Sequence, residues 1–152
     1  MPLTKDDLAR TVRTEDWNLR YYEAGGGRPL VLLHGSGPGA TGWSNFSGNI
    51  EALAENFHVY AVDVPGWSEV DGLPQGAPLP AWADLDRLRE IAVPTLLIHG
   101  RDDRVVPFES SLQLLARAPD SRLVLLNRCG HWAMIEHADG FNRLVADFVR
   151  SS

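Results

Sequence analysis

The segment Pro94-Thr-Leu-Leu-Ile-His-Gly-Arg-Asp-Asp103 joins a short apolar run to a polar turn. Similar apolar runs occupy residues 30–33, 59–62 and 123–126. None of the four alternates polar with apolar residues. Continuous runs of this length are typical of parallel strands covered on both faces, although periodicity alone does not exclude a buried helix. We therefore expect four strands, each followed by a turn.

Helical periodicity separates these apolar runs. Apolar residues recur at i, i+3, i+4, i+7 and i+8 across residues 141–149, the spacing of an amphipathic helix. Residues 112–116 and 82–91 carry shorter helical patterns, and residues 44–56 form a weaker one. Strands that alternate with helices predict the α/β class, as a three-layer domain with a mainly parallel sheet.

The order of the strands leaves two alternatives. Residues 17–22 alternate in part and precede a run of three glycines, which predicts a hairpin into the run at 30–33. If strand 30–34 pairs directly with strand 94–98, the spatial order is 59–63, 30–34, 94–98 and 123–127. Otherwise the sheet is interrupted and has open edges, which recruit a second copy of the chain or aggregate.

Length and composition set the broad class. The chain has 152 residues, of which 44% are hydrophobic and 22% charged, values that fit a single globular domain over residues 1–152. A net charge of −6 disfavours binding to nucleic acid or to a membrane surface. We expect no metal or other cofactor, because Cys129 is the single cysteine and no nucleotide-binding motif is complete.

The sequence also contains signals that bear on the cellular location of the protein. No apolar run is long enough for a membrane span, and the first ten residues are too polar and acidic for a signal peptide. A single cysteine also excludes a disulfide within the chain. A cytoplasmic protein is therefore expected.

Functional groups of an open parallel sheet gather at the carboxyl ends of its strands. After the first run lies the glycine-rich loop His34-Gly-Ser-Gly-Pro-Gly39. Its glycines would let backbone N–H groups approach a phosphate or an oxyanion. The loop lacks the lysine of a P-loop, and a simple strand-to-helix turn explains it equally well.

A histidine and an aspartate follow the last two runs. His131 is a candidate general base, and Asp103, 28 residues earlier, could orient it from the neighbouring strand end. Asp102 is the rival for this role. The alternative is that both aspartates are solvated turn residues and that His131 is structural.

Four segments make the chain resemble the α/β-hydrolase family: LLHGSGPGATGWSNFSGNI, VYAVDVPG, VPTLLIHGRDDRVVP and NRCGHWAMIEHADGFNRLVADF. Within that family they look most like the meta-cleavage-product hydrolases, which cut carbon–carbon bonds in ring-opened aromatic or steroid catabolites. The resemblance covers roughly residues 15–70 and 80–150. It implies a reduced α/β-hydrolase core and a small-molecule carbonyl substrate of the 2-hydroxy-6-oxo-dienoate type.

The resemblance also implies roles for particular residues. Asp103 is similar to the acid and His131 to the base of the family's catalytic triad. Backbone N–H groups at Ser36 and Gly37 correspond to its oxyanion hole. The positions that correspond to its substrate pocket are Gly35, Asn45 and Trp132.

The chain departs from the family at the nucleophile. The family places a serine in a Gly-x-Ser-x-Gly elbow, and none of the nine serines here has glycine on both sides at that spacing. Ser68 and Ser44 are half matches, of which Ser68 is the better substitute because it follows a strand and a glycine. Cys129 is a second substitute, although a small buried residue is the simpler interpretation.

The segment around residues 68–80 replaces the family's elbow and most of its lid, so the chain resembles a hydrolase with an internal deletion. Two functions compete on this basis. One is a weak or impaired hydrolase of the carbon–carbon or ester type. The other is a non-catalytic product, whether a remnant, a truncated protein or a small binding or assembly module.

Overall fold

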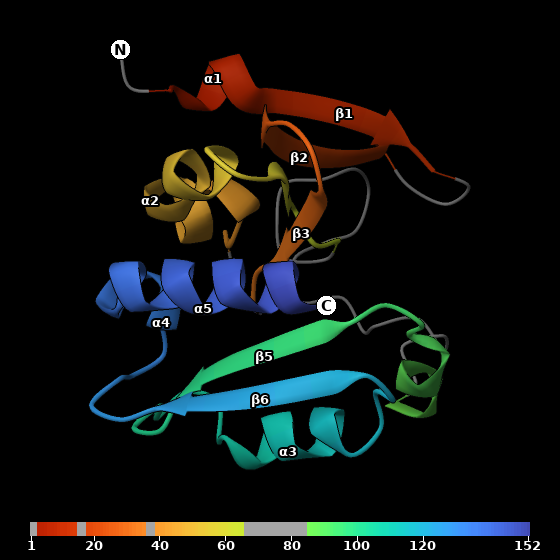
Figure 1. Cartoon of the computed structure of the whole chain (residues 1–152), viewed down its shortest axis with the longest axis vertical. Coiled ribbons are helices and arrows are strands. Elements are labelled where there is room, and N and C mark those ends of the chain that lie inside the picture. Colours follow the sequence, from red (N-terminus) through yellow and green to blue (C-terminus); the bar gives the residue numbers. More distant parts are fainter. Residues whose placement is uncertain (1–2, 15–17, 36–38, 66–84) are drawn as a thin grey trace. The chain divides into compact units, whose positions relative to one another are not determined.

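A computed structural model describes residues 3–14, 18–35, 39–65 and 85–152 (Figure 1). The chain divides into two compact units, Met1–Pro78 and Leu79–Ser152. In the described part of the chain, no helix has the length and apolar character needed to cross a membrane. The proposed deletion near residues 68–80 lies outside the described residues.

The first unit contains a four-stranded mixed sheet in the order β1-β2-β4-β3. β1 pairs antiparallel with β2, β2 pairs antiparallel with β4, and β3 pairs parallel with β4. In chain order its elements are α1 (Lys5–Leu8), β1 (Ala9–Arg13), β2 (Asn18–Gly25), β3 (Pro29–Leu33), α2 (Gly42–Ala54) and β4 (His58–Val62).

The predicted hairpin between β2 and β3 is wrong, because β4 lies between these two strands. The connection through α2 returns the chain beside β3 in the parallel sense, as a βαβ unit requires, and leaves the other edge of β4 for β2. Gly25 ends β2 with a φ of 78°, and a Cβ at this position would clash with the backbone of Ala54 and Phe57. A glycine is therefore required where β2 meets the end of α2.

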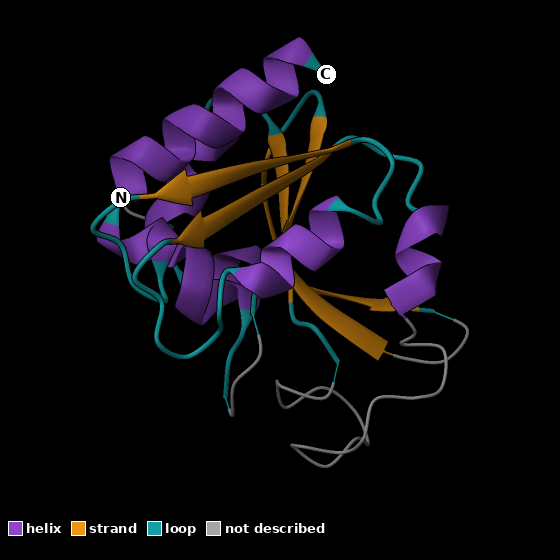
Figure 2. Ribbon diagram, turned by 90° about the horizontal axis from the view of Figure 1, so that it is seen from below, coloured by secondary structure: helices purple, strands orange, loops and turns teal. Residues whose placement is uncertain are grey.

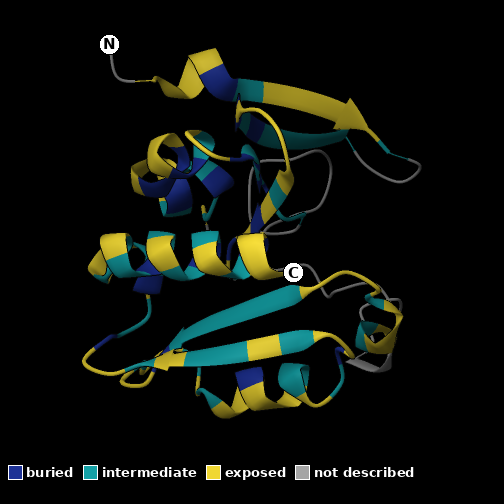
Figure 3. Cartoon of the chain, in the orientation of Figure 1, coloured by how far each residue is buried: buried dark blue, intermediate teal, exposed yellow. Residues whose placement is uncertain are grey.

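The core of the first unit lies between α2 and the sheet. α2 begins at a capping box made by Thr41 and Ser44, which supplies the partners that the first turn of a helix lacks. Figure 3 shows the buried stripe of α2, opposite its exposed outer face. The side chains of this core are buried, and they include Tyr22, Phe46, Ile50, Leu53 and Val59.

The second unit is built on a two-stranded parallel sheet, β5-β6. Its elements are the 3-10 turn η1 (Leu85–Glu90), β5 (Thr95–Gly100), α3 (Glu109–Leu115), β6 (Ser121–Leu126), α4 (Ala133–Glu136) and α5 (Ala138–Ser151). α3 and α5 cover the sheet from opposite sides (Figure 1). Figure 2 shows the helices and strands of the described residues by colour.

All four apolar runs form strands, and each pairs parallel with one other. In the described part of the chain, however, they divide between two sheets, so the order in which strand 30–34 pairs with strand 94–98 is not formed. Each parallel pair is joined by one short crossover helix, α2 or α3. The short crossover helix determines which two strands pair within a unit. The apolar pattern of a strand does not indicate which further strand would pair with it.

Candidate active site

The turns after β5 and β6 continue the contact between these strands. Arg101 N–H donates to the Leu126 carbonyl at 2.8 Å, and Asp102 N–H donates to the Cys129 carbonyl at 2.9 Å. A Cβ on Gly100 would clash with the backbone of Cys129 and Gly130, so glycine permits this close approach. The two turns are thereby held side by side, each with a functional side chain just beyond the contact.

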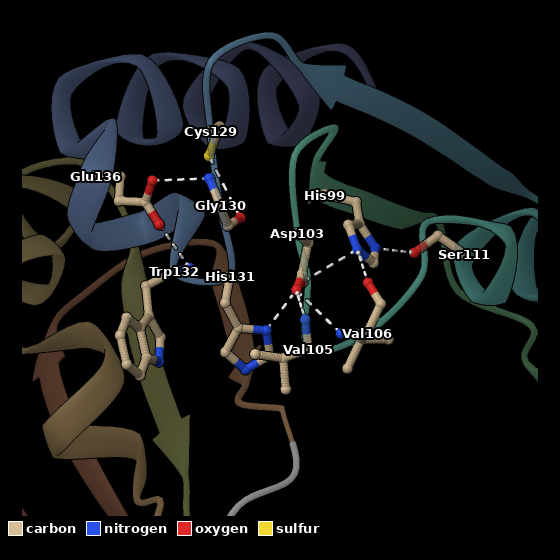
Figure 4. A network of polar contacts seen from close by, with 10 residues as sticks. All are labelled: His99, Asp103, Val105, Val106, Ser111, Cys129, Gly130, His131, Trp132 and Glu136. Carbon is tan, nitrogen blue, oxygen red and sulfur yellow. Dashed lines mark hydrogen bonds and ion pairs between the residues drawn. The ribbon is translucent and has the colours of Figure 1, made fainter.

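Asp103 and His131 meet at this point (Figure 4). His131 Nδ1–H donates to Asp103 Oδ2 at 2.9 Å, which is the contact that the sequence analysis expects. The other carboxylate oxygen, Oδ1, accepts the backbone N–H groups of Val105 at 2.8 Å and Val106 at 3.0 Å. The Asp103 side chain is only 4% exposed, and that of His131 is 21% exposed. This geometry directs Nε2 of His131 away from Asp103.

Two opposing effects act on the pKa of Asp103. Burial acts to raise it, because it disfavours the charged carboxylate. The hydrogen bonds from Val106 N–H, His131 and Val105 N–H, together with the attraction of His131, outweigh burial and lower the pKa. Asp103 is therefore ionised near neutral pH and can orient an imidazole and stabilise its charged form.

A second histidine, His99, also contacts the Asp103 carboxylate. His99, in β5, is half as exposed as His131, at 11% of its side chain. Its Nε2 lies 3.0 Å from the Val106 carbonyl oxygen and 3.3 Å from Asp103 Oδ2. Its Nδ1 lies 2.6 Å from the Ser111 hydroxyl in α3. A chain of polar contacts thus runs from α3 to His131.

Glu136 holds the turn that carries His131. Its Oε2 accepts Gly130 N–H at 2.7 Å, and its Oε1 accepts Trp132 N–H at 3.1 Å. These two hydrogen bonds lower the pKa of Glu136. One carboxylate therefore fixes the backbone on both sides of His131, although Glu136 itself does not contact the imidazole.

Two other candidates of the sequence analysis take different roles. Asp102 is half exposed and forms an ion pair with Arg101 at 3.4 Å, so it is not the partner of His131. Cys129 is 1% exposed, and burial, followed by the nearby acidic groups, raises the pKa of its thiol. A buried and protonated thiol is a poor nucleophile, which agrees with the structural interpretation of Cys129.

The candidates for substrate contacts belong to both units of the chain. Trp132 is 54% exposed and packs edge-on against His131, with ring centroids 5.6 Å apart. Asn45 lies in the first unit, where its amide donates to the Thr41 carbonyl at 3.0 Å. Gly35, also in the first unit, accepts a hydrogen bond from His34 Nδ1 at 2.7 Å. Ser44 belongs to the cap of α2 rather than to a nucleophile elbow. Ser36, Gly37 and Ser68 lie outside the described residues.

Sequence reasoning missed His99 and Ser111 as partners of the site. His99 precedes Asp103 by four residues in the same strand-to-turn segment, but the direction of its imidazole depends on the turn that follows β5. Ser111 is one of several serines and carries no sequence signal of its own. Glu136 follows Trp132 by four residues, a spacing that suits a carboxylate bonded to a backbone N–H at a helix start.

The chain is similar in sequence to known alpha/beta hydrolases. A model of the "Alpha/beta hydrolase family" matches residues 68–144, half of the chain. The 2-hydroxy-6-oxo-6-phenylhexa-2,4-dienoate hydrolase of Burkholderia cepacia is 45% identical over 107 residues, which cover 70% of this chain and 32% of that protein. The chain thus spans about a third of the length of this relative.

A longer match contains a large gap. A 2-hydroxy-6-oxononadienedioate/2-hydroxy-6-oxononatrienedioate hydrolase of Pseudomonas putida is 28% identical over 264 positions, covering 89% of this chain and 92% of that protein. Because this chain has 152 residues, about half of those positions have no counterpart in it. This relative is therefore much longer than the chain.

Solved structures show the same fold. The meta-cleavage product hydrolase CumD of Pseudomonas fluorescens IP01 has a TM-score of 0.74 at 20% identity, covering 95% of this chain and 98% of that one. A 2-hydroxy-6-oxo-6-phenylhexa-2,4-dienoate hydrolase of Rhodococcus sp. strain RHA1 has a TM-score of 0.71 at 20% identity, covering 94% and 98%.

Proposed function

The chain belongs to the alpha/beta hydrolase family, and we propose that it is a hydrolase of the meta-cleavage-product type with weak activity. The observation that carries the proposal is the ion pair between Asp103 and His131 at 2.9 Å. The similarity of 70% of the chain to a 2-hydroxy-6-oxo-dienoate hydrolase supports this substrate class. The substrate would be a small ring-opened carbonyl compound.

In this proposal His131 acts as the general base and Asp103 orients it. Hydrogen bonding of Nδ1 to Asp103 leaves Nε2 to take a proton from the attacking group and to return it to the leaving group. Trp132, beside the imidazole, would contact the substrate. Gly35 and Asn45 remain candidates for substrate contacts, and Ser36 and Gly37 remain candidates for the oxyanion hole.

The attacking group is either water or a serine at a new position. Because the chain contains no Gly-x-Ser-x-Gly, the elbow that would place a serine within about 3 Å of base and oxyanion donors is missing. Ser68 is the proposed substitute. Without a placed nucleophile, binding and an oxyanion hole alone can retain roughly 10³–10⁴-fold catalysis over water, by analogy with triad knockouts.

Turnover by the purified chain tests this proposal. We expect slow hydrolysis of an activated ester and of a 2-hydroxy-6-oxo-dienoate, strongly reduced in His131→Ala. Asp102→Asn is the matched control, because Asp102 is a neighbouring aspartate that pairs with Arg101 instead of His131. Loss of turnover in Ser68→Ala would identify the nucleophile, whereas its retention would favour water.

The second candidate function is a non-catalytic product of a deletion. The missing elbow and the gap of about half of the aligned positions in the Pseudomonas putida relative favour it. Absence of turnover on both substrates in a folded sample, with the Asp103–His131 pair intact, would support this alternative and contradict the first.

We also propose a cytoplasmic homo-oligomer that binds neither nucleic acid nor membrane. β3 is at one end of its sheet, and Val31 and Leu33 are 57% and 65% exposed, which favours pairing with a second copy. Analytical ultracentrifugation tests this, with Val31→Lys expected to shift the sample to monomer. A monomer in the unaltered protein would overturn it.

A further inference from the structure

His99 and Ser111 form a network of polar contacts with Asp103 and Val106, and neither residue belongs to the predicted triad. His99 contributes its imidazole from β5, and Ser111 contributes its hydroxyl from α3 (Figure 4). Ser111 is 8% exposed, and both side chains are far enough from solvent that their partners must come from the protein. Their contacts restrict the position of the Asp103 carboxylate.

The partners of His99 define its tautomer. Nε2 faces two oxygens that only accept hydrogen bonds, the Val106 carbonyl at 3.0 Å and the ionised Asp103 carboxylate at 3.3 Å. Nε2 therefore carries a proton. Nδ1 faces the Ser111 hydroxyl at 2.6 Å, a group that can donate. The Ser111 O–H donating to a bare Nδ1 fixes the proton on Nε2, where it points at the Asp103 turn.

Val106 links this histidine to the carboxylate. Its carbonyl accepts from His99 Nε2–H, while its N–H donates to Asp103 Oδ1 at 3.0 Å. The turn from Asp103 to Val106 is thus held at both backbone polar groups of Val106, its carbonyl and its N–H. A rotation of the Asp103 side chain would break the bond to Val106 and would bring Oδ2 away from both imidazoles at once. Hydrogen bonds linked in this way strengthen one another in a buried setting.

We infer that His99 and Ser111 form a positioning pair, which fixes the Asp103 carboxylate and through it the orientation of His131. His99 does not face the reacting group and exchanges no proton in the reaction. Ser111 donates to His99 Nδ1 and so helps to keep the His99 proton on Nε2. His99 directs this N–H at Asp103 Oδ2, the oxygen that also accepts His131 Nδ1–H. The catalytic consequence of this inference rests on the proposed function, whereas its structural part does not.

The test measures the His131 Nδ1–H proton directly. Proton NMR of the selectively ¹⁵N-histidine-labelled chain gives its solvent exchange rate, which reports how well the imidazole is held on Asp103. We expect His99→Leu to accelerate this exchange at least tenfold, because Leu fills the space without a donor. His99→Gln, which restores an N–H donor, should remain within about threefold of the unaltered protein. Ser111→Ala should lie between them, since the tautomer of His99 is then no longer fixed.

His58→Leu is the matched control. His58 also pairs with a carboxylate, Glu23, at 2.7 Å, but it belongs to the first unit. Its removal should leave the His131 Nδ1–H exchange rate unchanged. Urea unfolding of every variant separates a general loss of stability from a loss of positioning. If His99→Leu does not fold, the contrast between His99→Gln and Ser111→Ala decides the question.

Equal exchange rates in the unaltered protein, His99→Leu and Ser111→Ala would overturn the inference. So would a His99→Gln variant that folds with normal stability but exchanges as fast as His99→Leu. Because exchange is measured without substrate, it distinguishes this inference from the proposed function. Where turnover is present, kcat should fall in His99→Leu with little change in KM, since positioning affects the transition state rather than binding.

Discussion

Asp63 and Asp103 follow strands in different units, and their carboxylates are almost completely excluded from solvent, yet their pKa values move in opposite directions. The side chains are 0% and 4% exposed. The pKa of Asp63 is raised, with burial as the main cause, whereas hydrogen bonds overcome burial and lower the pKa of Asp103. Burial alone therefore does not determine the charge of a strand-end aspartate.

The difference lies in the number of donors. Asp63 Oδ1 accepts Gly42 N–H at 2.7 Å, and Arg20 Nε lies 3.9 Å from Oδ2. Among the residues that the structure describes, Oδ2 of Asp63 has no hydrogen-bond partner. Asp103 receives N–H groups on both oxygens. Asp63 thus anchors the start of α2 as a structural group, and Asp103 is equipped to remain ionised beside a histidine.

The largest expected effect is on turnover. Asp103→Asn retains the shape of the side chain but removes the charge that orients His131, so kcat should fall at least about tenfold, with the order of 10⁴-fold loss of an intact triad as the upper limit. Steady-state hydrolysis of the dienoate measures this. Asp63→Asn should change kcat less than tenfold if the two aspartates differ as described, and an equal loss in both variants would remove the distinction.

Gly100→Ala should cause the next largest effect. The added Cβ clashes with the backbone of Cys129 and Gly130, so the two turns must separate, at a cost of about 3 kcal/mol or more. Urea unfolding of the second unit measures this loss. Gly48→Ala is the control, because a Cβ there meets nothing within 4 Å, and it should be neutral or stabilising by up to about 1 kcal/mol. Equal stability of the two variants would contradict the close approach of the turns.

Asp63 and Asp103 should contribute to the pH dependence of stability with opposite signs. The raised pKa of Asp63 favours folding while the carboxyl is protonated, so this stability is present below the unfolded pKa of about 4 and is lost as the pH rises through the folded pKa. The lowered pKa of Asp103 stabilises the folded state above about pH 4, and this is lost as the pH falls through the folded pKa.

Hydrogen exchange in urea, followed separately in each unit from pH 3 to pH 7, measures both terms. As the pH rises, the free energy of unfolding of Asp63→Asn should increase relative to that of the unaltered protein. The free energy of unfolding of Asp103→Asn should decrease relative to it over the same range. For the exposed Asp102→Asn, the difference in free energy of unfolding from the unaltered protein should not change with pH. If this difference changed with pH in the same direction for Asp63→Asn and Asp103→Asn, their hydrogen bonds would not decide the charge.

The smallest effect concerns Glu136. Glu136→Gln leaves one acceptor oxygen for two backbone N–H groups, so stability should fall by about 1 kcal/mol at neutral pH. The lowered pKa of Glu136 places this contribution above its unfolded pKa, and it is lost on acidification. Chemical unfolding at pH 7 and pH 3 measures it. A difference of the same size at both pH values would show that the charge of Glu136 is not involved.

The sequence by itself predicted the four apolar strands, the C-terminal helix and the approach of the turns that carry Asp103 and His131, but it did not predict β1 or α1. Apolar runs must be buried whatever their neighbours, and the amphipathic spacing of residues 141–149 is specified by the same local rule. The GRDDRVVP and CGHW motifs follow strands that one short helix connects, so their approach is also a local consequence. The choice of Asp103 over Asp102 came from the resemblance, and the contacts of the turn agree with it.

Only the tertiary structure decided the strand order and the environment of each carboxylate. β4 separates β2 from β3 because α2 returns the chain between them, which no residue pattern in β2 announces. His99 contacts Asp103, and Ser111 contacts His99, because the turn after β5 folds back toward α3. Whether a buried carboxylate is charged depends on how many N–H groups converge on it. For Asp103, Val105 and Val106 donate from the same turn, whereas His131 donates from the turn after β6.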